Sequence, residues 1–307
     1  AMLWDERGER TWIYRNFGID LFIQANRQLT FCTGDCMKNT TRSDMEHLTH
    51  KGLVIRETDF GDNDRYISVL TEEGRRIEVL CKGVRRRGGR MMNAVRLFCY
   101  SELTLYQGRG GKYTLQQADL IASFWGVTES METYALCCYL AELTGHMTDT
   151  EEDSPAAARL LLYALHALAE QKRDRLTVKA AFELRLMAES GYEPEVSRCS
   201  VCGEPLGNSP WFSPRDGVCR CASCAERLGA PGYVRLIPAT FSAIRHILTQ
   251  ELPRVYAFAL SGPARVQLAQ VCEAYALCRA ERGFDSLTFY RSLEPEGAIS
   301  PTFGAKT

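Results

Sequence analysis

The sequence predicts an α+β multi-domain protein in which a small β-barrel precedes an α-helical domain that is interrupted by a four-cysteine zinc site. Three observations support this fold class. Short apolar runs separated by turn residues fill Lys51–Thr114. From about residue 126 onward the apolar residues recur with helical periodicity. Two Cys-x-x-Cys pairs, separated by 18 residues, lie between the predicted helices.

The barrel is predicted for residues 45–125 from apolar runs that have the length and composition of strands. Turns containing glycine, asparagine or aspartate separate these runs, which is typical of a small all-β domain. Gly108–Gly111 joins the last two runs in a hairpin pattern. The predicted strands are Leu53–Ile55, Tyr66–Leu70, Arg76–Leu80, Ser101–Tyr106 and Tyr113–Leu115.

Positive charge is concentrated in one part of this barrel. Between Lys82 and Lys112 the chain has eight basic residues and one acidic residue, a charge of +7, whereas the whole chain carries −1 and the remainder therefore −8. Such a local field indicates a polyanionic ligand, most often a phosphate backbone, although a basic loop kept for solubility is the alternative. The predicted DNA-binding residues are Arg65, Lys82, Arg85, Arg86, Arg87, Arg90, Arg109 and Lys112.

The same stretch resembles a known family. Gly52–Arg65 (GLVIRETDFGDNDR), Leu70–Gly74 (LTEEG) and Cys81–Arg86 (CKGVRR) are similar to the start of the bacterial DNA repair proteins of the RecO family. The resemblance implies that the barrel is an OB-fold, a fold suited to oligonucleotides. Tyr66 or Tyr106 would then add base stacking, unless the barrel core buries them.

Composition places the chain among ordinary globular proteins. Its 307 residues are 45% apolar and 24% charged, enough for two or three domains. No run approaches the ~20 apolar residues of a membrane helix. Ile19–Ala25, the most apolar part of the N-terminus, is interrupted by Asp20 and Gln24, so we expect no signal peptide. Thirteen cysteines without an export signal indicate a reducing cytoplasm, with some thiols bound to metal.

Residues 1–44 have no sustained periodicity and no assigned role. Cys32 and Cys36 are too few for a closed zinc site. The resemblance begins after this segment, and Met45 stands where a family member could start. We therefore interpret 1–44 as an N-terminal extension and expect a chain that starts at Met45 to fold and bind DNA.

Helices are predicted in two blocks, 126–196 and 233–290. Ser154 and Pro155 form a helix start signal, with serine as the cap. Gly145 is expected to end the first helix, and Gly191 follows the third. The predicted helices cover residues 131–145, 156–170, 176–190, 238–250 and 263–283.

The segment 197–232 holds the cysteines predicted to bind metal, Cys199, Cys202, Cys221 and Cys224. Each Cys-x-x-Cys turn presents two thiolates to one ion, and two such turns complete a tetrahedron. A disulfide would need an oxidising compartment, and a redox pair would need an α/β context that is missing. Four protein ligands imply a structural Zn²⁺ site without an open position. Cys219 remains an alternative to Cys221.

The resemblance continues through these residues in the same order: Phe182–Met187, Gly191–Pro194, Cys199–Gly203, Phe212–Gly217 and Cys221–Cys224. It covers Lys51 to about Tyr290 and leaves a C-terminal tail, 291–307. It implies a cytoplasmic, nucleoid-associated recombination mediator that binds single- and double-stranded DNA and anneals complementary strands. With RecR it would load RecA onto strands coated by single-strand binding protein, and RecF is a further implied partner.

Signals for catalysis are absent from the sequence. There is no Gly-x-Ser-x-Gly and no His-Glu-x-x-His. Gly108–Lys112 lacks the first glycine and the Ser/Thr of a P-loop. We therefore predict a protein that is not an enzyme. The alternative is a metal-dependent nucleic-acid-processing enzyme, for which Asp62 and Asp64 are the only suggestion.

The helical domain is the predicted site for protein partners. Because the chain outside the basic segment is acidic on balance, that surface should repel DNA. The resemblance implies that it binds RecR and the acidic, apolar-ended tail of single-strand binding protein. Such a tail needs an apolar pocket with a basic rim, for which Arg159, Arg185 and Arg245 are the candidates.

Overall fold

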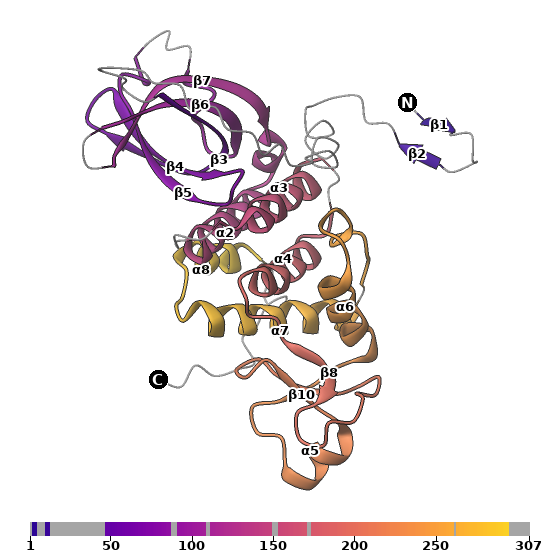
Figure 1. Cartoon of the computed structure of the whole chain (residues 1–307). Helices are drawn as coiled ribbons and strands as arrows, with labels where there is room; N and C mark the ends of the chain where they lie inside the picture. Colours follow the sequence, from indigo (N-terminus) through magenta and orange to yellow (C-terminus); the bar gives the residue numbers. More distant parts are fainter. Residues whose placement is uncertain are drawn as a thin grey trace, which may run out of the picture.

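The computed structural model describes residues 2–4, 10–12, 47–86, 91–108, 111–148, 153–170, 173–260 and 262–294. Most of the extension 1–44 and all of the tail from residue 295 therefore lie outside the described residues. Within the extension, β1 (Met2–Trp4) pairs antiparallel with β2 (Arg10–Trp12). A barrel, a helical domain and a cysteine-rich module follow one another from the top to the bottom of Figure 1.

The predicted barrel is confirmed as a closed sheet in the order β3-β4-β5-β7-β6. β5 pairs with β7 in parallel and every other pair is antiparallel, which is the OB-like arrangement. Alternate residues of the strands, among them Val54, Ile67 and Val79, are fully buried inside it. The strands are β3 (His47–Phe60), β4 (Asp64–Thr71), β5 (Arg76–Cys81), β6 (Cys99–Gln107) and β7 (Tyr113–Ser123).

The helical domain is also confirmed, with helix ends that differ from the predictions by a few residues. Two short 3₁₀ turns, η1 (Trp125–Glu129) and η2 (Leu252–Arg254), accompany the helices. No helix of the described residues is long and apolar enough to cross a bilayer. The α-helices are α2 (Met131–Met147), α3 (Pro155–Ala169), α4 (Arg175–Glu189), α6 (Pro238–Thr249), α7 (Gly262–Ala280) and α8 (Asp285–Leu293).

The structure adds three details to the predicted helices. Helix α2 ends near Gly145, as predicted, with Met147 as its last residue; a Cβ at Gly145 would lie 3.1 Å from Ile55 Cδ1 of the barrel. Ser154 is the N-cap residue of α3 and Pro155 begins the helix, as predicted, but the Ser154 side chain makes no capping hydrogen bond. Helix α8, which was not predicted, packs against α2 and includes the start of the expected tail.

One hydrophobic cluster joins the outside of the barrel to the helices. Leu53 and Leu70 on the barrel belong to the same cluster of buried residues as Leu140 of α2. The turn between β4 and β5 also contacts the start of α3, because a Cβ on Gly74 would lie 2.0 Å from the carbonyl oxygen of Ser154. The barrel is therefore attached firmly to the helical domain.

A charged cluster lies in the centre of the helical domain. Lys179 on α4 is fully buried, and its Nζ lies 2.7 Å from a Glu183 oxygen and 2.6 Å from a Glu273 oxygen. The hydroxyl of Tyr139 donates to Glu183 at 2.7 Å, and Arg291 of α8 pairs with Glu273. Burial raises the pKa of Glu183 to about 7, although Lys179 opposes the shift. The cluster joins α2, α4, α7 and α8 through groups that must stay paired.

Candidate metal centre and nucleic-acid interface

The predicted metal ligands lie in a small module between α4 and α6. Its sheet has the order β11-β9-β10-β8, and the short helix α5 (Ala222–Leu228) follows β10. Cys199 is the last residue of β8, Cys202 lies in the turn after it, Cys221 immediately precedes α5, and Cys224 lies in the first turn of α5. The strands are β8 (Glu195–Cys199), β9 (Trp211–Ser213), β10 (Val218–Arg220) and β11 (Val234–Arg235).

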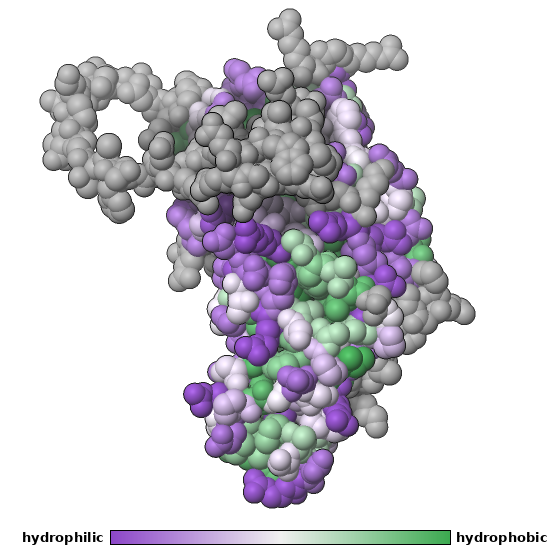
Figure 2. Space-filling model, turned by 90° about the vertical axis from the view of Figure 1, so that its right-hand side faces the viewer, coloured by the Kyte–Doolittle hydropathy of each residue, from purple (hydrophilic) through white to green (hydrophobic). Residues whose placement is uncertain are grey.

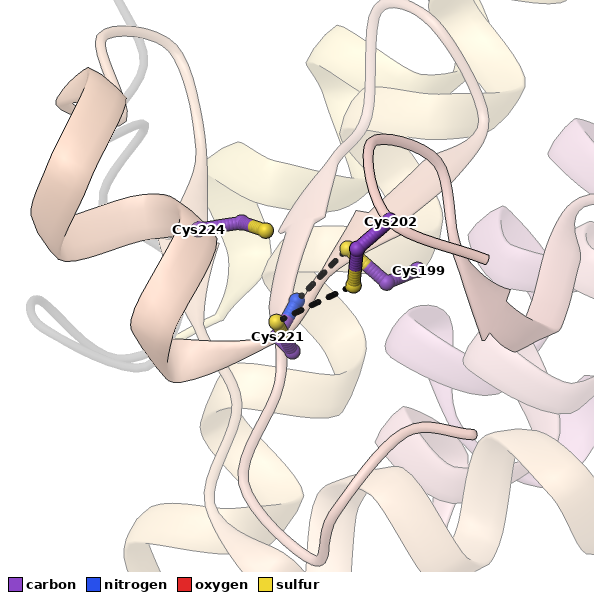
Figure 3. A group of neighbouring side chains, drawn as sticks. All are labelled: Cys199, Cys202, Cys221 and Cys224. Atoms are coloured by element: carbon purple, nitrogen blue, oxygen red, sulfur yellow. Dashed lines mark hydrogen bonds between the residues drawn. The ribbon is translucent and has the colours of Figure 1, made fainter. Parts of the chain in front are cut away.

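The four sulfur atoms converge on one point. Each Sγ of Cys199, Cys202, Cys221 and Cys224 lies within 4.8 Å of the others, and Cys202 Sγ is 3.8 Å from Cys221 Sγ (Figure 3). A tetrahedral ion with ~2.3 Å metal–sulfur bonds needs sulfurs about 3.8 Å apart. The group can therefore hold a metal ion, and in the described part of the chain it is the only such group.

The surroundings of Cys199 favour its thiolate form. Burial opposes ionisation, but hydrogen bonds from the backbone N–H groups of Cys202, Cys221 and Val201 outweigh it and lower the pKa of the Cys199 thiol to about 6. The N–H of Cys221 lies 3.3 Å from Cys199 Sγ. Such N–H donors are typical of cysteine knuckles that bind a cation.

The structure decides between Cys219 and Cys221, which the sequence left open. Cys219 lies in β10, is fully buried and packs into the hydrophobic core that the module shares with the helices. Burial raises the pKa of its thiol to about 12. The side chain of Cys221, in contrast, belongs to the converging group (Figure 3). The four-sulfur set is thus the one that contains Cys221.

Most of the described residues that were predicted to bind DNA lie at one end of the barrel. Arg65 pairs with Cys81 at the end of β5, so Lys82 and the chain that follows lie beside the turn between β3 and β4. Leu80 pairs in parallel with Thr114, so Lys112 lies beside the middle of β5 and not beside Lys82. Lys82, Arg85, Arg86 and Lys112 are all exposed. Arg87, Arg90 and Arg109 lie outside the described residues.

Two of these cations already have carboxylate partners. Arg65 lies 2.8 Å from Glu57 and 2.9 Å from Asp59, and only 11% of its side chain is exposed. Arg85 lies 3.4 Å from the other oxygen of Asp59. Arg65 therefore links β4 to β3 through ion pairs. A contact between Arg65 and DNA has less support than a contact of Lys82 or Arg86 with DNA.

Asp62 and Asp64, which suggested a metal-dependent enzyme, do not lie in a metal-binding arrangement. Asp64 accepts a hydrogen bond from the backbone N–H of Gly83 at 2.7 Å, which ties the start of β4 to the loop after β5. Asp62 is exposed in the turn between β3 and β4. Neither belongs to a group of carboxylates, cysteines or histidines close enough to hold a metal within the described residues.

An exposed aromatic pair lies at the same end of the barrel. The side chains of Phe60 and Tyr66 are in contact, with ring centroids 5.2 Å apart at an interplanar angle of 70°. Tyr106, the other predicted stacking residue, is half-buried on β6. The sequence analysis overlooked Phe60, although it is an aromatic residue directly before the Gly61–Asn63 turn of a strand that contributes to the basic end.

Comparison with known protein families identifies the family of the chain. A model described as "Recombination protein O N terminal" matches residues 45–124, and one described as "Recombination protein O C terminal" matches residues 128–288, more than half of the chain. The chain belongs to the RecO family. The first match covers the barrel, and the second covers the helices together with the cysteine module.

Relatives of the RecO family resemble the chain over most of its length. A DNA repair protein RecO of Acetivibrio thermocellus is 27% identical over 81% of this chain and 98% of its own. One of Symbiobacterium thermophilum is 29% identical over 79% and 96%. One of Dehalococcoides mccartyi is 31% identical over 67% and 80%.

The three arginines considered for a peptide site differ in their surroundings. Arg185 donates to the carbonyl oxygens of Ile247, Leu248 and Gln250 and pairs with Glu189, so it holds the end of α6. Arg159 is half-buried on α3. Arg245 is exposed on α6.

The exposed Arg245 lines a surface groove of about 380 Å³ where the cysteine module meets α6. Pro194, Val196 and Leu248 supply apolar surface, while Glu193 and Glu195 line the groove with negative charge. Among Arg159, Arg185 and Arg245, it is thus Arg245 that lies at the edge of a groove.

Proposed function

We propose that the protein is a non-enzymatic recombination mediator that binds single- and double-stranded DNA and anneals complementary strands in DNA repair. The observation that carries this proposal is the basic end of an OB-like barrel in a chain that belongs to the RecO family. In OB-folds, oligonucleotides bind across the second and third strands and to the loops between strands 1 and 2 and between strands 4 and 5. Here those strands are β4 and β5, and the loops are Gly61–Asn63 and Gly108–Lys112.

Binding rests mainly on phosphate contacts from Lys82, Arg86 and their neighbours. If about four cations touch phosphates, log affinity falls against log salt with a slope of roughly −3 on single strands. Replacing Arg85, Arg86 and Arg87 by alanine should weaken binding to all sequences alike and flatten that slope. Arg254→Ala, which removes an exposed arginine at the end of η2, is the matched control. An unchanged slope in the triple variant would place the DNA site elsewhere.

Strand annealing separates this proposal from simple DNA binding. Two complementary labelled strands are mixed with the purified full chain, and duplex formation is followed by fluorescence. The wild-type chain should accelerate annealing, and the triple variant should not. The competing reading, a metal-dependent enzyme, predicts turnover of a labelled oligonucleotide with magnesium; intact oligonucleotide after prolonged incubation would count against it.

The metal in the cysteine group is Zn²⁺ in a structural role. Four thiolates in a tetrahedral arrangement suit zinc, and they leave no open position for a substrate. When bound, the ion would hold β8 and the start of α5 together. Purified protein should contain about one zinc per chain. Changing Cys199 or Cys224 to serine should lower thermal stability before it changes intrinsic affinity for DNA.

Protein partners bind the helical part of the chain and the cysteine module. RecR, RecA and RecF are the partners that the family resemblance implies, and with them the protein would act in the cytoplasm at the nucleoid. Apolar residues gather over the middle and lower part of the face in Figure 2. Such a patch on a protein surface is typical of interaction sites.

The acidic, apolar-ended tail of single-strand binding protein occupies the groove beside Arg245. Titration of a labelled tail peptide against the full chain should give weaker binding for Arg245→Ala and unchanged binding for Arg254→Ala. Binding of the tail peptide should depend less on salt than DNA binding does, because fewer ion pairs form. Equal affinities for both variants would exclude this groove, where Glu193 and Glu195 already oppose an anionic peptide.

A further inference from the structure

Phe60 and Tyr66 form an exposed aromatic pair that the barrel core does not need. Phe60 is 53% exposed and Tyr66 is 37% exposed. The ladder pairs Phe60 with Asp64 and Thr58 with Tyr66, so the two rings are diagonal neighbours on the same face of the sheet. The opposite face of β4 carries Ile67, which is fully buried in the barrel. The pair therefore lies on the outer surface.

Basic residues lie next to this pair. The backbone N–H of Arg85 donates to the carbonyl oxygen of Asn63 at 3.0 Å, so the loop after β5 packs against the turn that follows Phe60. Lys82 and Arg86 in that loop are exposed. Cations beside exposed rings match the two parts of a single strand, its phosphates and its bases.

The acidic residues nearby are largely compensated. Glu57 and Asp59 pair with Arg65 and Arg85, and Asp64 accepts from the N–H of Gly83. Asp62, exposed in the turn, opposes a phosphate there. The positive surface next to the rings is therefore on the side of the loop after β5, and not at the tip of the β3–β4 turn.

We propose that Phe60 and Tyr66 are a stacking platform for unpaired nucleobases, which gives the barrel a selective affinity for single strands over duplex. This inference rests on the proposed DNA binding and assigns the part of the ligand that the aromatic pair contacts. Bases of a duplex are stacked on one another and do not reach a protein ring, whereas bases of a single strand do. The cations contribute to the binding of both single strands and duplex, whereas the stacking platform contributes to the binding of single strands alone.

The test compares three ligands of equal phosphate number with the full-length chain: a single-stranded oligothymidylate, an abasic strand and a hairpin duplex. Phe60→Ala and Tyr66→Ala should each bind the single strand about 5- to 150-fold more weakly, the range expected for loss of one stacked base. Binding of the duplex and of the abasic strand should change less than twofold. The salt slope on single strands should stay the same, because no phosphate contact is removed.

Controls separate stacking from damage to the fold. Tyr66→Phe keeps the ring and should retain wild-type affinity. Phe289→Ala removes an aromatic side chain that is 49% exposed on α8, and should leave binding of all three ligands unchanged. Melting temperatures of all variants show whether they are folded.

Two outcomes would overturn the inference. One is an equal loss on the single strand, the duplex and the abasic strand, which would make the pair a support for the basic loop. The other is no loss on the single strand. A wild-type chain that binds none of the ligands would instead overturn the proposed DNA binding itself.

Discussion

Lys179→Met should destabilise the protein more than any surface substitution. Lys179 and Glu183 have no exposed side-chain surface, and the exposed fraction of Glu273 is 6%. Methionine has a similar length but no charge, so two buried carboxylates lose their common cation while Arg291 remains near Glu273. Removing one partner of a buried ion pair costs about 3–5 kcal/mol. This is a large part of the ~5–15 kcal/mol by which proteins are usually stable.

The loss of stability caused by Lys179→Met should increase with pH. The pKa of Glu183 in the folded chain, about 7, lies above its ordinary value of 4.5 mainly because of burial. Protonation therefore favours the folded form: this contribution is complete below about pH 4.5 and is lost as the pH rises through about 7. Without Lys179 the ionised carboxylate loses its counter-charge, and the deficit of the variant should grow between pH 5 and pH 8.

Urea unfolding of the wild-type chain and of Lys179→Met, followed by circular dichroism at pH 5, 7 and 8, measures this difference. Glu183→Gln and the double variant complete a cycle, and the double variant should be less destabilised than the sum of the two single changes. If Lys179→Met lowers the free energy of unfolding by less than about 1 kcal/mol at pH 7, or by the same amount at every pH, the buried groups do not form a charged cluster.

Three further predictions concern the metal, the barrel–helix contact and the extension. Cys221→Ser should lose bound metal whereas Cys219→Ser should retain it, as measured by metal analysis of the purified proteins; the reverse result would assign the fourth ligand to Cys219. Gly74→Ala and Gly61→Ala both place alanine at a positive φ, which costs about 1–2 kcal/mol. Only Gly74 also meets the backbone at the start of α3, so its variant should be a further ~1–3 kcal/mol less stable in urea unfolding. A chain that starts at Met45 should fold and bind DNA, and an insoluble product would show that the preceding segment belongs to the core.

Several features were predictable because they depend on residues close together in the sequence. Apolar runs between turn residues, such as Tyr66–Leu70, identified the strands, since alternation along a strand follows from its geometry. Two Cys-x-x-Cys turns predicted a group of four cysteines that could hold a metal ion, because each turn brings two sulfurs together without help from the rest of the fold. The basic segment after Lys82 could likewise be counted directly.

Tertiary structure decided what depends on contacts between distant residues. Arg65 was predicted to contact phosphate, and only the structure shows that Glu57 and Asp59 lie beside it. Spacing favoured Cys221 and left Cys219 as an alternative, and the packing of β10 against the helices separated them. The sequence placed Gly145 near the end of α2, and only the fold shows that this glycine also makes room for the barrel. In each case the deciding partner is another segment, whose position follows from the fold as a whole and from no local pattern.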